Sequence, residues 1–362
     1  MNLRPKKIDS YIFWKFMRTF ILAMLFIIVI VIIFDISEKI DKFVANEAPL
    51  KAVVLDYYVN FIPYFVNMYS PLFVFITVII FTSKMASDSE IIAILSSGVS
   101  YRRMLVPYLV GAAIIAAGSL YLNLFVIPDS NQERMKFETQ YIRARTVSDR
   151  NIHYQIDSGQ FVYVESFTTW NNTAYRFTLE EIRDNKLVSK LTADSAEWDS
   201  TLGGWHLHRY FLRNYLDGMT DQVTSGRQID TVINLTVSDF YRNKNTVETL
   251  PYKDLRWLIH TQKMRGDKNV MYAEIEMQNR FALPFSAFIL TVMGVCLSSR
   301  KRRGGIGWNI AIGIALSFSY ILFMKFSQVF VYANLMSPGV AIWLPNVIFL
   351  GVMAYLYHKA QK

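Results

Sequence analysis

The sequence predicts an α-helical membrane protein with six transmembrane helices, arranged three and three around an inserted all-β, jelly-roll-like domain. The 362-residue chain is 52% hydrophobic, and its apolar residues form long uncharged runs in two groups near its ends. About 20 mostly apolar residues are enough to cross a bilayer as a helix. Between the two groups, from about residue 151 to residue 240, short alternating runs are separated by turn residues, which is typical of antiparallel strands.

The first group predicts three spans. Residues 20–34 lack polar side chains, and residues 57–83 and 104–127 lack charges. No small-residue cleavage pattern follows the first run, so it is a membrane span and not a secretory signal. The charged residues after it predict that this helix continues into the far interface. Pro63 and Pro71 predict a kink in the second span.

A short polar island separates the second and third spans. Ser87 and Glu90 have the spacing of a capping box, in which each side chain satisfies a free backbone N–H of the other. Ile91, Ile92, Ile94 and Leu95 follow, and Gly98 stands where a left-handed helix stop is expected. These residues predict a helix of about three turns over residues 87–98, outside the membrane; an ordinary interhelical loop is the alternative.

The rest of the chain supplies the β domain and three more spans. A polar helical stalk after Pro128 leads to strands that include residues 160–165 and 232–237 and the alternating Tyr175, Phe177 and Leu179. An amphipathic helix over residues 250–266 precedes the spans, which are expected at 281–299, 304–330 and 340–357. The predicted domains are therefore 1–127, 128–265 and 266–362.

Charge predicts the orientation. The formal net charge is +9, and basic residues gather at the N-terminus, after the island, at residues 300–303 and at the C-terminus. Lys and Arg accumulate on the cytoplasmic side of membrane proteins, so both termini and the island are expected there. The β domain is then outside, in the periplasm of a bacterium. In a membrane protein such a charge indicates lipid contacts and not nucleic acid.

The sequence lacks the motifs of an enzyme or of a nucleotide-binding protein. It has no GxxxxGK[ST], no GxSxG and no HExxH, and Cys296 is the only cysteine. His206 and His208 share one strand face and are expected to be ordinary strand residues. We therefore expect no catalytic residues, no metal and no cofactor. The near absence of charges within the spans also argues against an ion-coupled transporter.

Five basic residues near the outer ends of three helices form a candidate site for a phosphorylated lipid headgroup. Each alone is more often a solvated or interfacial charge, but together they supply cations from three helices at one membrane level. They are Lys39, Lys42, Arg134, Lys136 and Lys325.

Four segments resemble the lipopolysaccharide export permeases LptF and LptG (the YjgP/YjgQ family). They read IDSYIFWKFMRTF, SEIIAILSSGVSYRRM, AEWDSTLGGWHL and EIEMQNRFALPFSAFILTVMGVCLSSRKRRGG, and the opening and residues 35–43 are closer to LptG. The resemblance implies an inner-membrane subunit that pairs with its paralogue, binds an LptB ATPase dimer and LptC, and passes lipopolysaccharide to a periplasmic LptA-type bridge. Such a permease subunit has no nucleotide site of its own.

The resemblance also gives the island a role, since the family's short cytoplasmic helix couples to the ATPase. The residues that it assigns to this coupling are Glu90, Ile91, Ile94, Leu95 and Gly98. Two other functions remain open from the sequence: an ion-coupled lipid transporter, and a membrane-anchored sensor whose β domain binds a periplasmic ligand.

Overall fold

A computed structural model describes residues 7–142, 148–168, 171–215, 221–240, 247–264, 269–299 and 305–360. The chain divides into two compact units. Met1–Ile142 and Glu274–Lys362 form a helical bundle, and Arg143–Ala273 form a unit built on a β-sheet. The basic run at residues 300–303, which helped to orient the sequence, lies outside the described residues.

The bundle contains six helices that are long and apolar enough to cross a membrane, as the sequence predicts. The first is α1 (Lys7–Ala45). The second combines α2 (Leu50–Ala52), a π-helical turn η1 (Val53–Tyr58) and α3 (Val59–Ser87), and the third combines α5 (Tyr101–Tyr121), a second π-helical turn η2 (Leu122–Val126) and α6 (Ile127–Tyr141). The last three are α10 (Val270–Ser298), α11 (Gly305–Tyr332) and α12 (Pro338–Ala360).

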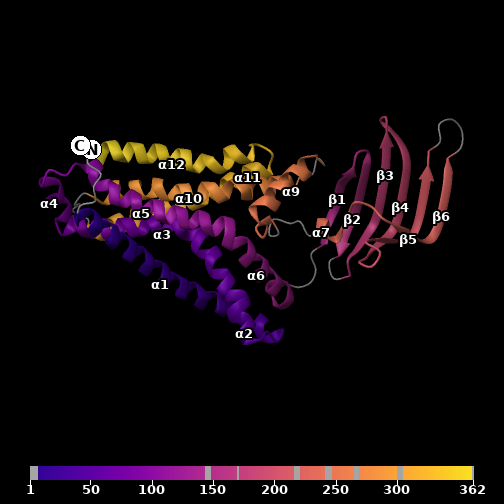
Figure 1. The fold of residues 1–362 in the computed structure, drawn as a ribbon, viewed down its shortest axis with the longest axis horizontal. Helices are drawn as coiled ribbons and strands as arrows, with labels where there is room; N and C mark the ends of the chain where they lie inside the picture. Colours follow the sequence, from indigo (N-terminus) through magenta and orange to yellow (C-terminus); the bar gives the residue numbers. More distant parts are fainter. Residues whose placement is uncertain are drawn as a thin grey trace. The chain divides into compact units, whose positions relative to one another are not determined.

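The predicted polar stalk is the continuation of the third span. Pro128 stands in the first turn of α6, directly after the π-helical turn η2. The short α4 (Glu90–Ser96) joins the second and third spans. It lies at one end of the bundle, together with the start of α1 and the end of α12 (Figure 1). We call this the α4 end.

The β unit contains one antiparallel sheet whose six strands lie in sequence order. The strands are β1 (Ser148–Asp157), β2 (Gln160–Thr168), β3 (Thr173–Arg183), β4 (Lys186–Asp199), β5 (Gly204–Asn214) and β6 (Gln222–Thr231). The predicted all-β insert is confirmed. Its described strands form a single up-and-down antiparallel sheet that is not closed into a barrel.

The predicted strand over residues 232–237 is wrong. β6 ends at Thr231, and the chain then forms an irregular segment and the single turn α7 (Val237–Phe240). Leu235 and Phe240 are buried in the sheet's apolar core, where the Trp205 indole N–H donates to the Leu235 carbonyl over 2.8 Å. Burial against the core, and not pairing, fixes this segment. The expected amphipathic helix is present as α9 (Tyr252–Met264).

A row of charged residues crosses the sheet. At this row the regular alternation of side chains between the two faces of each strand is interrupted. Arg176 in β3 and Arg209 in β5 have positive φ angles of 50° and 51°, a conformation that is uncommon outside glycine. Their ion pairs reach Glu165 and Asp194 on neighbouring strands, over 3.0 and 2.8 Å. The predicted regular alternation along β3 is therefore interrupted at Arg176.

On β3 itself, Phe177 is fully buried, whereas Tyr175 is 40% exposed, so the two rings do not share the core environment that regular alternation predicts. The change of side at Arg176 keeps Ala174, before it, and Phe177, after it, in the same apolar core.

Candidate docking helix and headgroup site

The island forms a helix of about two turns, shorter than predicted, and its first residue is Glu90. The predicted capping box is wrong, because Ser87 is the last residue of α3 and the N-cap residue is Ser89, with φ of 62° and no capping bond from its side chain. The predicted left-handed stop is correct: Gly98 has φ of 86°, and its N–H donates to the Leu95 carbonyl over 3.1 Å.

The Glu90 carboxylate is directed to α1. Its two oxygens accept hydrogen bonds from the Lys15 ammonium group over 3.1 and 3.2 Å and from the Tyr11 hydroxyl over 3.2 and 3.1 Å. The Lys15 ammonium group also donates to the Tyr11 hydroxyl over 2.8 Å. The three side chains therefore form a closed polar cluster between α4 and the second and third turns of α1.

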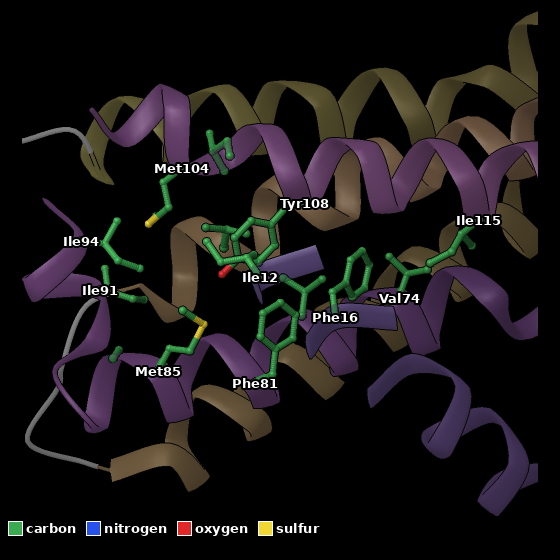
Figure 2. Packing of buried hydrophobic residues seen from close by; sticks show 14 residues of the cluster. Ile12, Phe16, Val74, Phe81, Met85, Ile91, Ile94, Met104, Tyr108 and Ile115 are labelled. Atoms are coloured by element: carbon green, nitrogen blue, oxygen red, sulfur yellow. The ribbon is translucent and has the colours of Figure 1, made fainter. Parts of the chain in front are cut away.

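The two faces of α4 have different surroundings. Ile91 and Ile94 are 2% and 9% exposed and point into the apolar cluster at the α4 end, toward Met85, Met104 and Tyr108 (Figure 2). Their role there is packing, so they are not free to meet a partner.

Ile92 and Leu95 face outward instead, with 56% and 37% of their surface exposed. Of the three apolar residues that the sequence assigned to ATPase coupling, only Leu95 lies on the outer face. Ile92, which also lies there, was not among them. Residues three apart share a helix face, so the sequence divides these four side chains into two pairs without showing which pair faces the bundle.

At the opposite end of α1, Lys39 belongs to a compact aromatic and charged cluster. It forms an ion pair with Asp35 one turn earlier and contacts the Tyr57 hydroxyl, with its ammonium group 4.9 Å from the centre of the Tyr57 ring. The Tyr58 hydroxyl donates to the other Asp35 oxygen over 3.1 Å. These contacts join α1 to the π-helical turn η1.

Arg134 approaches the same stretch of the second span from α6. Its guanidinium lies 4.6 Å from the centre of the Tyr64 ring, and its Nε is 3.5 Å from a Glu138 oxygen. Phe137, one turn further along α6, packs in the same apolar cluster as Phe43 of α1 and Tyr57. Lys39 and Arg134 thus contact aromatic rings that lie about two turns apart on the second span.

The other three predicted headgroup residues differ in their surroundings. Lys136 is exposed and pairs with Glu133 over 2.7 Å. Lys42 is exposed on α1, one turn beyond Lys39. Lys325 is exposed on α11, which packs against α3 and α12, and the aromatic cluster formed by the described residues does not include it.

A buried polar network, which the sequence did not single out, joins three helices inside the bundle. The Asn67 amide donates to the Asn123 side-chain oxygen over 2.7 Å and accepts from the Ser119 hydroxyl over 2.6 Å. Asn123, in the π-helical turn η2, donates to the Arg280 carbonyl over 3.3 Å. The only sequence signal was amide side chains within otherwise uncharged runs. Polar groups within a membrane bundle are held by such mutual hydrogen bonds.

Within the described part of the chain, no three His, Cys, Asp or Glu side chains are placed to hold a metal ion. The model of the lipopolysaccharide export system permease LptF/LptG family matches residues 10–359. The match covers the bundle helices and the inserted sheet alike. No curated protein matches the sequence.

Proposed function

The chain belongs to the LptF/LptG family of lipopolysaccharide export permeases, and we propose that it is one of the two membrane subunits of an ATP-driven exporter. In this proposal it pairs with its paralogue, recruits a separate LptB-type ATPase dimer and associates with LptC. It moves lipopolysaccharide from the inner membrane toward an LptA-type periplasmic bridge. The observation that carries the proposal is the family match across nearly the whole chain.

The α4 end supplies a surface for the ATPase. Ile92 and Leu95 are exposed apolar side chains on a helix that is packed firmly on its other face by Ile91 and Ile94. A rigid helix with two outward apolar anchors fits a groove on a partner. This supports docking through Ile92 and Leu95, with Gly98 ending the helix. In this proposal the α4 end faces the cytoplasm.

The opposite end of the bundle supplies a surface for the lipid. Lys39 and Arg134 flank the aromatic side chains of the second span, and Lys42 is exposed one turn away. Cations at this level attract the phosphates of lipopolysaccharide. Lys325 and Lys136 are less central, because Lys136 is already paired with Glu133 and Lys325 lies on α11.

The β unit supplies a path for the acyl chains. Its sheet has one apolar face, with a core that includes Val164, Phe177 and Leu207. Within the described residues, β1 and β6 each have a strand on one side only. Such free edges can pair with a strand of another sheet, which supports a continuous sheet toward LptC and the bridge, with the β unit in the periplasm.

Recruitment of the ATPase tests the proposal. The chain and its paralogue are co-expressed with the ATPase, and the amount of ATPase that co-purifies is measured. We expect Ile92→Asp with Leu95→Asp to lower recruitment at least about tenfold, since about 1.4 kcal/mol of lost binding gives that factor. The conservative pair Ile92→Val and Leu95→Met keeps the surface apolar and should recruit normally. An unmodified complex that recruits no ATPase would contradict the proposal.

A further inference from the structure

The helix α9 has one buried face and one exposed face. Leu255, Leu258 and Gln262 are buried, and they recur at the three- and four-residue spacing of a single helix face. The opposite face carries Trp257 and Met264, which are 61% and 74% exposed and lie about two turns apart. Exposed apolar side chains that gather on one face, with polar residues around them, mark an interaction surface.

The exposed face of α9 is also basic. Lys253, Arg256 and His260 are exposed and lie within four residues of Trp257. Lys253 stands in the first turn, where the helix dipole disfavours a cation, so it does not stabilise the helix itself. Asp254, the one acidic residue of α9, stands in the same turn, where the dipole favours it. The charge of this face therefore suits an anionic partner outside the helix.

The chain itself keeps α9 near the membrane. α9 ends at Met264, and α10, which is a candidate membrane span, begins at Val270. The connection between these two residues spans at most about 20 Å. The uncharged run of α10 begins at Phe281, about 16 Å along the helix from Val270 at 1.5 Å per residue. Covalent connection alone therefore holds α9 within reach of the lipid headgroups that border this run.

We propose that the exposed face of α9 binds the surface of the bilayer beside the fourth span. In this arrangement Trp257 and Met264 enter the headgroup layer, and Lys253, Arg256 and His260 meet anionic lipid phosphates. Helices that lie in a membrane surface combine an apolar centre with basic flanks in this way, and tryptophan is enriched at that level. Contact with the bilayer requires neither an ATPase nor lipopolysaccharide, so it is independent of the proposed function.

The depth of a spin label on α9 tests this contact in the complete chain, reconstituted in nanodiscs. A nitroxide is attached to Met264→Cys, and native Cys296 is buried and does not compete for the label. Relaxation of the label by membrane-soluble oxygen is compared with relaxation by a water-soluble nickel chelate. In nanodiscs of phosphatidylcholine and phosphatidylglycerol, we expect oxygen to relax it more strongly than nickel. A label at Leu202→Cys, in the exposed β4–β5 turn, should show the reverse.

Substitutions in the Met264→Cys chain separate the charged contacts from the apolar one. Lys253→Gln and Arg256→Gln should each lower the ratio of docked to undocked label about fivefold, since one cation near an anionic surface contributes about that factor. Trp257→Ser should also lower the ratio, because its ring is the larger apolar group on this face. Arg227→Gln is the matched control: Arg227 is an exposed cation on β6, and its loss should leave the ratio unchanged.

Three results would each overturn the proposal. The first is a label at residue 264 that nickel reaches as readily as it reaches residue 202 in the anionic nanodiscs. The second is a label shielded from both oxygen and nickel, which would place this face of α9 against protein. The third is an equal loss from Arg256→Gln and Arg227→Gln, which would show that the net charge of the chain, and not this face, attracts the lipid.

Discussion

At the scale of single residues, existing partners decide which cations can meet a lipid phosphate. Lys39 is 20% exposed and bound to Asp35, and Arg134 is 14% exposed beside Glu138. Both residues therefore stabilise helix contacts, because Lys39 joins α1 to the second span and Arg134 joins α6 to it. Lys42 is exposed on the same helix as Lys39. It is the residue at which headgroup binding can be tested without disturbing the aromatic cluster.

We predict that Lys42→Gln weakens lipopolysaccharide binding to the complex about fivefold, because one cation near an anionic membrane surface is worth about 1 kcal/mol. Equilibrium binding in nanodiscs at low and high salt measures it, and the difference should shrink at high salt. Lys136→Gln is the control, since Lys136 is exposed but paired with Glu133. Equal losses from the two substitutions would refute a specific role for Lys42.

His206 in β5 joins three strands of the sheet. Its ring nitrogens meet Asp230 on β6 and, over 3.0 Å, Asp199 at the end of β4. Bonds to Asp199 and Asp230 raise the pKa of His206, while bonds from Thr201 and His206 hold the pKa of Asp199 well below its usual range. His206 and His208, expected to be ordinary strand residues, therefore differ: His208 has one carboxylate neighbour, Glu197, at 3.4 Å.

We predict that β6 becomes less protected as pH rises. Because the folded-state pKa of His206 is raised, its protonated ring stabilises the folded state. This stabilisation is fully present below the unfolded-state pKa of about 6.5 and is lost as the pH rises through the folded-state pKa. The stabilisation of the folded state by ionised Asp199 is present above the unfolded-state pKa of about 3.9 and is lost in stronger acid. Amide hydrogen exchange of β6 in the full chain, corrected for intrinsic rates, should show protection falling as the pH rises above about 6.5.

His206→Asn should flatten this dependence, and His208→Asn should retain it. An unchanged pH profile in His206→Asn would show that the carboxylate contacts of His206 do not hold β6.

At the scale of elements, the contact between α1 and α5 depends on a glycine. A Cβ atom built at Gly111 would lie 2.5 Å from Cδ1 of Phe16. That ring is fully buried and stacked on Phe81, so it has no room to move aside. Small residues at such positions let membrane helices approach closely, and here the close approach fastens the start of α1 to the bundle.

We predict that Gly111→Ala destabilises the bundle by about 1–3 kcal/mol through overpacking. Gly118→Ala, two turns later on α5, meets no atom within 4 Å and should change stability by no more than about 0.5 kcal/mol. Denaturation in mixed micelles, followed by tryptophan fluorescence, compares the two variants. Equal stabilities would mean that Phe16 can repack around a methyl group.

At the scale of the whole molecule, a bundle of six membrane helices carries an inserted β unit between its third and fourth spans. In the proposed orientation, every segment that follows an even number of spans lies on the side of the N-terminus, and the β unit, which follows three spans, lies on the opposite side. The distribution of Lys and Arg favours the cytoplasm as the N-terminal side.

We predict that cysteines placed at Asp88 and at Leu202 are labelled from opposite sides. Leu202 is 45% exposed in the β4–β5 turn, and Asp88 is exposed next to α4. A membrane-impermeant maleimide, added to cells with a permeable outer membrane, should label Leu202→Cys, and Asp88→Cys only after lysis. The native chain is the control because Cys296 is buried. The reverse pattern would invert the proposed orientation.

Much of the fold could be predicted from local sequence signals. Uncharged runs located all six spans, and recurrent turn residues located the β insert, because hydropathy and turn chemistry act within a few residues. Gly98 was correctly placed at the end of α4 for the same reason. The family resemblance was also readable in the sequence, since it rests on contiguous segments spread over most of the chain.

The tertiary structure decided the partners of these residues. Sequence spacing gave Glu90 a local partner, Ser87, but the fold places Lys15 and Tyr11 within hydrogen-bond distance of its carboxylate. The positive φ at Arg176 reversed the expected environment of Tyr175 in the same way. Periodicity shows which side chains share a face, but only contacts between segments distant in the chain show where that face points. That is why the sequence alone determined where α4 lies and ends, and the packed bundle determined which of its residues can meet a partner.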